Sequence, residues 1–331
     1  MRQAPRRRCG PSTLRSVSTA ARPTRHHCPN GSKARRNPVG NTEPMARRRA
    51  QLVPWRVAGG VADEHANADA VVRETGWVFN NETGDDLTLG DFVMSGNKEV
   101  NAYMRVFGMN ELDTNSLSIL EIGSGIGRMT SRFTKRFASV IAADVDAAFL
   151  ERCRETVARH GEPDKLRTVH VADGHSIGVP SDSVDAVFSY ITLQHCAHED
   201  ALQLTSEALR IVKPGGTVML NYRTWVPADV VLQPAGTLVR ALWKTKLVGP
   251  RIARQRWATR LGWQANRVAV DEVLSLVSQS GRSCREVLVF HNPSRRNLLA
   301  SSPATVGGAR PEERPLPRAN KSHWWLILRL S

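Results

Sequence analysis

The segment LEIGSGIGR at residues 120–128 constrains the fold more than any other part of this chain, because it places a glycine-rich turn directly after a short apolar run. The run at 119–122 is typical of a buried parallel strand, and residues 128–137, which contain neither glycine nor proline, are predicted to form a helix. The three glycines of the turn are Gly123, Gly125 and Gly127. Glycine permits positive φ and has no Cβ to hold a ligand away, so the turn predicts a nucleotide-type site. A glycine turn that binds nothing is the alternative.

Strand and helix patterns alternate from Leu87 to Tyr222, which is typical of a parallel α/β sheet. The predicted strands are 119–122, 139–144, 167–174, 183–195 and 217–222, with a KPGG turn before the last, and the predicted helices are 95–108, 128–137, 146–161 and 199–212. The first helix is expected to begin near Ser95 or Asn97, and Asp146 is a candidate N-cap of the third. A helix at 270–281 and strands at 284–291 and 323–330 follow a basic, tryptophan-containing insert. We therefore predict a doubly wound, seven-stranded, mostly parallel sheet with a helical insert after the fifth strand.

Composition divides the chain into a basic tail and one folded domain. Residues 1–56 contain 14 Lys and Arg against one acid and show no hydrophobic periodicity, so we expect them to be disordered. They fit a solvated tail, an organelle transit peptide, or a stretch that precedes a true start at Met45. Residues 57–331 are expected to form the domain. Its predicted parts are a lead-in at 57–94, a core at 95–222, a helical cap at 223–266, and a final helix and strands at 267–331 with a mobile loop at 293–321.

The net charge of +15 is unevenly distributed, with +13 over residues 1–56, −10 over 57–221 and +12 over 222–331. Only the flanks therefore suit a polyanion or an anionic lipid surface. The five cysteines form no C-x-x-C pair, which argues against a disulfide framework or a zinc site, so we expect no metal and a reducing, cytoplasmic location. The apolar run at 324–330 is too short to span a bilayer.

Acidic residues end two of the predicted strands. Asp144 ends the second strand, 17 residues beyond Gly127, and Asp173 lies at the end of the third. In an open parallel sheet a ligand binds beyond the carboxyl ends of the strands, so we expect both acids and the fourth strand's end, Ser189 to His195, to meet the glycine turn at one crevice. The first acid suits a ribose diol and the second an adenine amino group. A helix cap or a solvated turn is the alternative for either acid alone.

Together these segments resemble the class I S-adenosylmethionine-dependent methyltransferases, in particular the small-molecule group called type 11. The matching segments are LEIGSGIGR (120–128), AADVD (142–146), VADG (171–174), DAVFSYITLQHC (185–196) and LRIVKPGGTVML (209–220). The resemblance covers about residues 95–222 and implies a Rossmann-like methyltransferase fold that binds S-adenosyl-L-methionine. Ile126, where the family often has a small polar residue, and the altered segment before VPSDSV depart from the pattern.

The resemblance also implies which residues bind the cofactor. It assigns the glycine turn to the methionine and ribose portions, Asp144 to the ribose diol, Asp173 to the adenine, and the end of the fourth strand to the methionine side. The implied cofactor-binding set is Glu121, Gly123, Ser124, Gly125, Gly127, Asp144, Val145, Asp173, Gly174, Ser189 and Tyr190. His195 is the candidate catalytic base, with His198 behind it, and a histidine that only hydrogen-bonds the loop is the alternative.

The leading function is methyl transfer to a small-molecule, lipid or sugar acceptor, at oxygen, by in-line displacement. Nucleic acid is a disfavoured partner, because the fourth strand lacks the Asn/Asp-Pro-Pro-aromatic signature of methyltransferases that act on amino groups of bases. The insert at 228–264 is a candidate wall for the acceptor or a peripheral membrane contact, with a solvated basic helix as the alternative. A protein that binds or methylates nucleic acid through its basic flanks is the alternative function, and the G-x-G-x-G spacing argues against a nicotinamide-dependent oxidoreductase.

Overall fold

The computed structural model describes residues 67–72, 87–253, 255–262, 266–295 and 297–331. The described residues all belong to one unit of the chain, residues 50–331. The predicted tail at 1–56 and much of the predicted lead-in, residues 57–66 and 73–86, lie outside the described residues.

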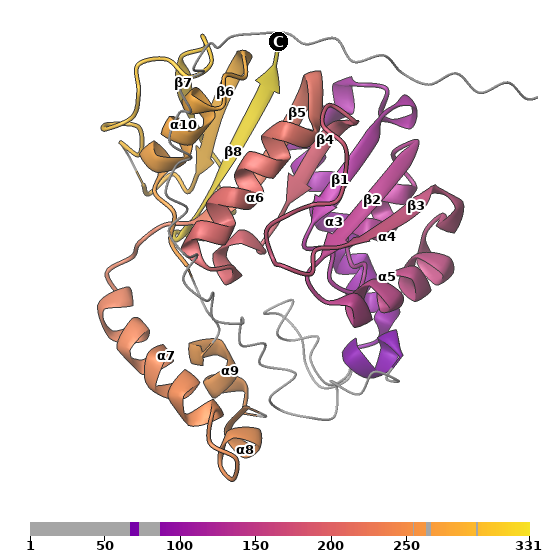
Figure 1. The fold of residues 1–331 in the computed structure, drawn as a ribbon, viewed down its shortest axis with the longest axis vertical. Helices are drawn as coiled ribbons and strands as arrows, with labels where there is room; N and C mark the ends of the chain where they lie inside the picture. The colour runs from indigo at the N-terminus through magenta and orange to yellow at the C-terminus, as the bar shows by residue number, and fades with distance from the viewer. Residues whose placement is uncertain (1–66, 73–86, 254, 263–265, 296) are drawn as a thin grey trace, which may run out of the picture. The chain divides into compact units, whose positions relative to one another are not determined.

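An eight-stranded sheet forms the centre of this unit, in the order β3-β2-β1-β4-β5-β8-β6-β7 (Figure 1). The strands are β1 (Ser118–Ile122), β2 (Ser139–Asp144), β3 (Leu166–His170), β4 (Val184–Ser189), β5 (Val212–Arg223), β6 (Cys284–His291), β7 (Pro311–Pro315) and β8 (His323–Leu330). The first five strands pair in parallel, whereas β8 runs antiparallel between β5 and β6. The strand order reverses at β1, which has β2 on one side and β4 on the other, so the carboxyl ends of these strands form the expected ligand crevice. The predicted fold class is confirmed.

The eighth strand is a correction to the prediction of seven. β7 lies within the stretch at 293–321 that was predicted to be a mobile loop, and it pairs in parallel with β6. Its sequence, PEERP, shows no alternation of apolar and polar residues, since an edge strand that buries little surface does not need an apolar face. Proline is tolerated at a sheet edge. Glu313 in this strand accepts a hydrogen bond from the Leu299 amide at 2.8 Å and lies 3.1 Å from His291 Nε2, which ties the stretch to β6.

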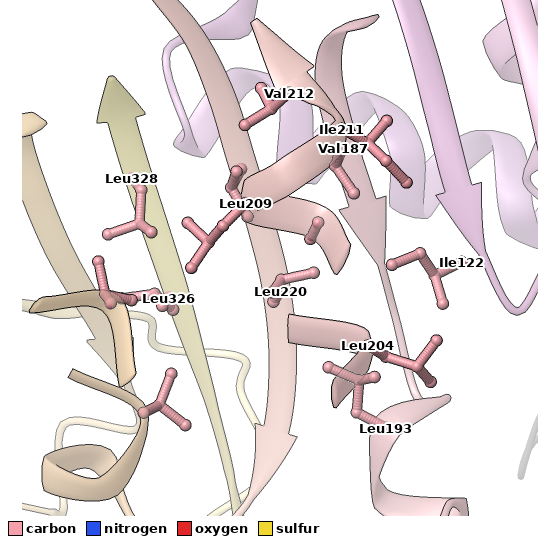
Figure 2. Packing of buried hydrophobic residues seen from close by; sticks show 14 of the residues in the cluster. Ile122, Val187, Leu193, Leu204, Leu209, Ile211, Val212, Leu220, Leu326 and Leu328 are labelled. Carbon is pink, nitrogen blue, oxygen red and sulfur yellow. The ribbon is translucent and has the colours of Figure 1, made fainter. Parts of the chain in front are cut away.

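Helices cover both faces of the sheet (Figure 1). On one face lie α6 (His198–Ile211) and α10 (Val270–Gln279), and on the other lie α3 (Leu89–Val106), α4 (Thr130–Thr134) and α5 (Ala147–His160). Alternating strand residues supply the two cores: Leu120 packs in the cluster under α6 and α10, and Ile119 in the cluster under α3 and α4. Figure 2 shows the first cluster, where Leu204 and Leu209 of α6 face Leu220 of β5.

Several element boundaries differ from their predicted positions. β3 and β4 end at His170 and Ser189, before the predicted ends at 174 and 195, so Asp173 and His195 lie in the segments that follow these strands. α3 begins at Leu89 and not near Ser95 or Asn97, because Thr88 caps it and forms a capping box with Asp91. α4 has only five residues, Thr130–Thr134, within the predicted helix at 128–137. β5 begins before the predicted KPGG turn, and its register shifts there, with Gly215 at a φ of +77°. α5 begins as predicted after Asp146, whose side chain accepts a hydrogen bond from the Ala148 amide.

The insert after β5 consists of α7 (Asp229–Trp243), α8 (Gly249–Ala253) and α9 (Arg256–Gly262), which pack mainly against one another (Figure 1). Val239, Trp243 and Ala258 form a small core between them. The buried carboxylate of Asp229 pairs with Arg223 at the end of β5, at 2.6 Å, and with Arg267 beyond α9, at 2.8 Å. One acid therefore joins the two ends of the insert.

Candidate functional site

A cavity of about 170 Å³ lies at the carboxyl ends of β1, β2 and β4. Its wall contains the glycine turn after β1, Asp144 and Val145 after β2, and residues 190–192 together with His195 after β4. Phe92 of α3 and Phe149 of α5 add apolar surface. The sequence predicts that these strand ends lie close together. In the structure they line one cavity, at the point where the strand order reverses.

The three glycines of the turn have three different surroundings, although all have positive φ. A Cβ on Gly125 would meet no atom within 4 Å, so at this position the backbone faces open space on the cavity wall. A Cβ on Gly123 would lie 2.2 Å from the side chain of Thr192, and one on Gly127 would lie 3.1 Å from Cys153 Sγ in α5. The missing Cβ of Gly125 therefore leaves space for a ligand. The missing Cβ atoms of Gly123 and Gly127 instead let Thr192 and Cys153 pack closely against the turn.

Asp144 holds the glycine turn in place and still faces the cavity. Its Oδ2 accepts a hydrogen bond from the Gly125 amide at 2.8 Å, and its Oδ1 accepts one from the Asp146 amide at 2.9 Å. Burial raises the pKa of Asp144 to about 6, although backbone donors at Asp146, Gly125 and Val145 oppose the rise. A carboxylate has about four lone-pair sites, so the group can still accept a hydrogen bond from a ligand hydroxyl.

Glu121 is the second acid on the cavity wall, and it is buried. The hydroxyl of Thr130 donates a hydrogen bond to its Oε2 at 2.6 Å. Burial nevertheless raises the pKa of Glu121 to about 8, so at neutral pH this group is mostly protonated. Asp144 is therefore the acid that carries the negative charge in this part of the cavity at pH 7.

Three residues of the implied cofactor set, Gly127, Asp173 and Ser189, do not line the cavity. The exposed carboxylate of Asp173 accepts hydrogen bonds from the amides of Ser176 and His175 at 2.8 and 3.0 Å. Although burial opposes them, these bonds lower the pKa of Asp173 to about 2. Ser189 donates a hydrogen bond to the Ile122 carbonyl at 3.0 Å and so ties β4 to β1. The adenine contact of Asp173 stays a prediction.

The segment after β4 is held in a strained conformation. Ile191 on the cavity wall has a φ of 52°, in the left-handed region that a β-branched residue rarely adopts. Its amide donates a hydrogen bond to Asn221 Oδ1 at 3.3 Å, and Asn221 in turn donates to the Trp324 carbonyl at 3.1 Å. Such strain persists where the surroundings fix it, and it is concentrated at functional sites.

The two candidate histidines occupy different surroundings. His195 ends a short 3-10 helix, η4 (Leu193–His195), and lines the cavity, with its Nε2 3.1 Å from Gln194 Nε2. His198 does not line the cavity. Its Nε2 lies 2.7 Å from Glu272 of α10, and this hydrogen bond raises the pKa of His198. Of these two, only His195 is placed to meet a ligand in the cavity.

The sequence analysis missed several residues of the wall, including Phe92 and Arg128. The guanidinium of Arg128 lies 5.8 Å from the centre of the Phe92 ring, and its Nη1 pairs with Glu99 of α3 at 2.6 Å. Arg128 belongs to the glycine motif, but its contacts with Phe92 and Glu99 of α3 arise from tertiary packing. No local sequence pattern predicts these contacts. Arg128 places a cation on the cavity wall, where the dipole of the five-residue helix α4 would contribute only a weak positive potential.

A family model described as a methyltransferase domain matches residues 120–220, the segment that builds most of this cavity. Residues 120–220 are a class I S-adenosylmethionine-dependent methyltransferase domain. The predicted family is thereby confirmed, and the cofactor of this methyltransferase domain is S-adenosylmethionine.

The methyltransferase domain has relatives of differing activity. It is similar to the biotin biosynthesis bifunctional protein BioHC of Cellvibrio japonicus, with 34% identity over 103 residues that cover 31% of this chain and 19% of that protein. It is also similar to the carboxy-S-adenosyl-L-methionine synthase of Pseudomonas putida strain F1, with 28% identity over 109 residues that cover 31% of this chain and 44% of the other. The chain thus spans less than half the length of either relative.

Among solved structures, magnesium protoporphyrin IX methyltransferase from Synechocystis PCC 6803 with bound SAH matches with a TM-score of 0.47 and 12% identity. The match covers 80% of this chain and 98% of that one.

The cavity of the methyltransferase domain fits this cofactor. Gly125 leaves open the space that a Cβ would occupy, and the Asp144 carboxylate could accept a hydrogen bond from a ribose hydroxyl. Phe149 would offer apolar surface to the adenine, and Arg128 would offer a cation to the carboxylate of the methionine part. Within the described ranges, no group of three or more His, Cys, Asp and Glu side chains could hold a metal ion, and none of the helices there has the length and apolar content to cross a bilayer.

Proposed function

We propose that the protein transfers a methyl group from S-adenosylmethionine to a hydroxyl group of a small-molecule, lipid or sugar acceptor, with His195 as the base. The observation that carries the proposal is the position of His195 on the same cavity wall as Gly125 and Asp144. Among the described residues, Cys153, Cys196 and Cys284 form no disulfide, which supports a reducing, cytoplasmic location.

The cofactor supplies an electrophilic methyl group on a positively charged sulfur, and the residues of the chain supply alignment and charge. Asp144, ionised at neutral pH, orients the ribose and adds a favourable negative charge near the sulfonium. Arg128 holds the carboxylate of the methionine part, so Asp144 and Arg128 together fix the ribose and the methionine of the cofactor. Alignment of this kind is the largest contribution that a protein can make to an in-line displacement.

His195 takes up the proton that a hydroxyl acceptor loses as its oxygen becomes the nucleophile. A positioned base of this kind contributes on the order of 10²- to 10⁴-fold to the rate. Tyr190 and Thr192, which line the cavity beside His195, form the surface against which the acceptor packs. A neutral amine already carries a nucleophilic lone pair and can lose its proton after methylation, so a large effect of removing His195 argues against a nitrogen acceptor. A carbon acceptor also loses a proton, so the labelled product must distinguish oxygen from carbon.

The test incubates the full chain with methyl-labelled S-adenosylmethionine and fractionated cell extract, and identifies the labelled product. We expect the label on an oxygen atom in a small-molecule or lipid fraction. We expect His195→Asn to lower turnover at least about 100-fold with unchanged affinity for S-adenosylhomocysteine, and His198→Asn, the matched control, to retain turnover. Label on carbon, on nitrogen or in nuclease-sensitive material would contradict the proposal.

A further inference from the structure

Helix α7 has two apolar faces, and one of them lacks a protein partner among the described residues. Its inner face, with Gly236, Val239 and Trp243, packs against α8 and α9. On the opposite side, Val231 and Leu238 are 71% and 63% exposed. The residues on this side recur at a spacing of three or four, which places them in one stripe. The stripe consists of Val231, Pro234, Leu238 and Ala241, all exposed.

Exposed apolar residues continue along the insert beside basic ones. Leu247, between α7 and α8, is 86% exposed, and Trp257 of α9 is 55% exposed. The neighbouring side chains of Lys244, Lys246 and Arg251 are exposed as well. Residues 230–269 contain eight Lys and Arg and no Asp or Glu. The insert therefore combines exposed apolar side chains with exposed positive charge, since its one acid, Asp229, is buried.

This combination selects among the possible partners. Two inserts that met face to face in a dimer would bring two sets of like charges together, and no acid of the segment 230–269 could offset them. A nucleic acid would neutralise the cations but would leave Val231, Leu238 and Leu247 without apolar contacts. The surface of an anionic bilayer satisfies both, because apolar side chains enter the boundary of the acyl chains while Lys and Arg stay beside lipid phosphates.

We propose that the insert formed by α7, α8 and α9 docks on the surface of a bilayer that contains anionic phospholipids. Its small core lets the three helices present this surface as a unit, and the ion pairs of Asp229 with Arg223 and Arg267 attach the unit to the end of β5. The proposal goes beyond the methyl transfer proposed above and does not depend on it. It assigns a role to exposed apolar residues that the cavity does not use.

The test uses the full chain and sedimentation with vesicles of phosphatidylcholine, with or without phosphatidylglycerol. We expect binding to the anionic vesicles that weakens as salt rises, and little binding to phosphatidylcholine alone. The double variant V231E/L238E should lower the affinity for anionic vesicles at least tenfold. The double variant V106E/L112E, in which two exposed apolar residues outside the insert receive the same charges, should bind as the unaltered chain does. Calorimetry with S-adenosylhomocysteine checks that each variant is folded.

Three outcomes would overturn the proposal. The first is the absence of binding to anionic vesicles. The second is equal binding by V231E/L238E and the unaltered chain, because the surface responsible would then lie elsewhere, for example in the basic residues 1–56. The third is a self-association, measured by analytical ultracentrifugation, that V231E/L238E abolishes while vesicle binding persists. A failure of methyl transfer would leave each of these results unchanged.

Discussion

The ring of Tyr190, on the cavity wall, stacks on the indole of Trp325 in β8, with centroids 5.4 Å apart and ring planes at 8°. Tyr103 of α3 packs against both rings, with its centroid 5.0 Å from that of Tyr190 and 4.7 Å from that of Trp325. A strand near the end of the chain therefore fixes the orientation of a residue beside the glycine turn.

Replacing Trp325 should affect both stability and binding. We expect Trp325→Leu to lower the free energy of unfolding by about 2–4 kcal/mol, because it removes a buried ring, and to weaken the binding of S-adenosylhomocysteine several-fold. Trp324→Leu is the matched control, since Trp324 stacks on Tyr222 in the core on the opposite face. It should cost similar stability and leave binding unchanged. Equal loss of binding in both variants would show that Tyr190 is not held in this way.

Alanine at Gly125 should block binding without unfolding the protein. The new Cβ meets no protein atom, so the cost to the free chain is the strain of a φ of +54°, about 1 kcal/mol. Gly215→Ala is the matched control, because Gly215 also has positive φ and open space but does not line the cavity. Calorimetry with S-adenosylhomocysteine should show a loss of at least tenfold in affinity for the first variant alone. Normal affinity in Gly125→Ala would mean that the backbone at this position does not approach the cofactor.

The charge of Asp144 should make cofactor binding depend on pH. Its pKa is about 6, and the ionised form is the one that accepts hydrogen bonds from a ribose diol. Affinity for S-adenosylhomocysteine should therefore fall as the pH drops below about 6. Asp144→Asn should bind at least tenfold more weakly at pH 7, and its affinity should vary little across this range. A pH profile that is the same in the variant would assign the titration to another group.

Glu121 should reduce stability at alkaline pH. Its pKa in the folded chain, about 8, lies above the ordinary value of 4.5, so the folded state holds the proton more tightly than the unfolded state does. The stabilising contribution of the protonated group is complete below pH 4.5 and is lost as the pH rises through 8. Glu121→Gln, which stays neutral, should match the unaltered chain near pH 4.5 and become more stable than it by a few kcal/mol at pH 9. Urea unfolding at several pH values measures this difference, and a constant difference would contradict the assignment.

The sequence predicted the parts of the fold that rest on local patterns. The glycine turn, the apolar runs and the Asp146 cap gave the order of strands and helices, and the strands at 284–291 and 323–330 match β6 and β8. β7 was missed because PEERP is held by backbone pairing at an edge and carries no hydrophobic pattern. The true start of α3 did have a signal, the Thr88 and Asp91 capping box, which the prediction overlooked.

The candidate site was predictable only where it follows from strand ends. Asp144 and the glycine turn lie on the cavity wall because any doubly wound sheet brings such positions together. The contacts of Arg128 with α3 and of Tyr190 with β8 join segments that are far apart in sequence. No local pattern in the sequence predicts such contacts. The packing of Thr192 against Gly123 likewise appears only in three dimensions.

The Asp229 carboxylate pairs with Arg223, from the strand before the insert, and with Arg267, from the segment after it. Both ends of the insert meet at this one carboxylate, so the three helices between them form a branch of the chain with a single anchored base. A change confined to α7, α8 or α9 therefore need not alter the pairing of β5 with β4 and β8.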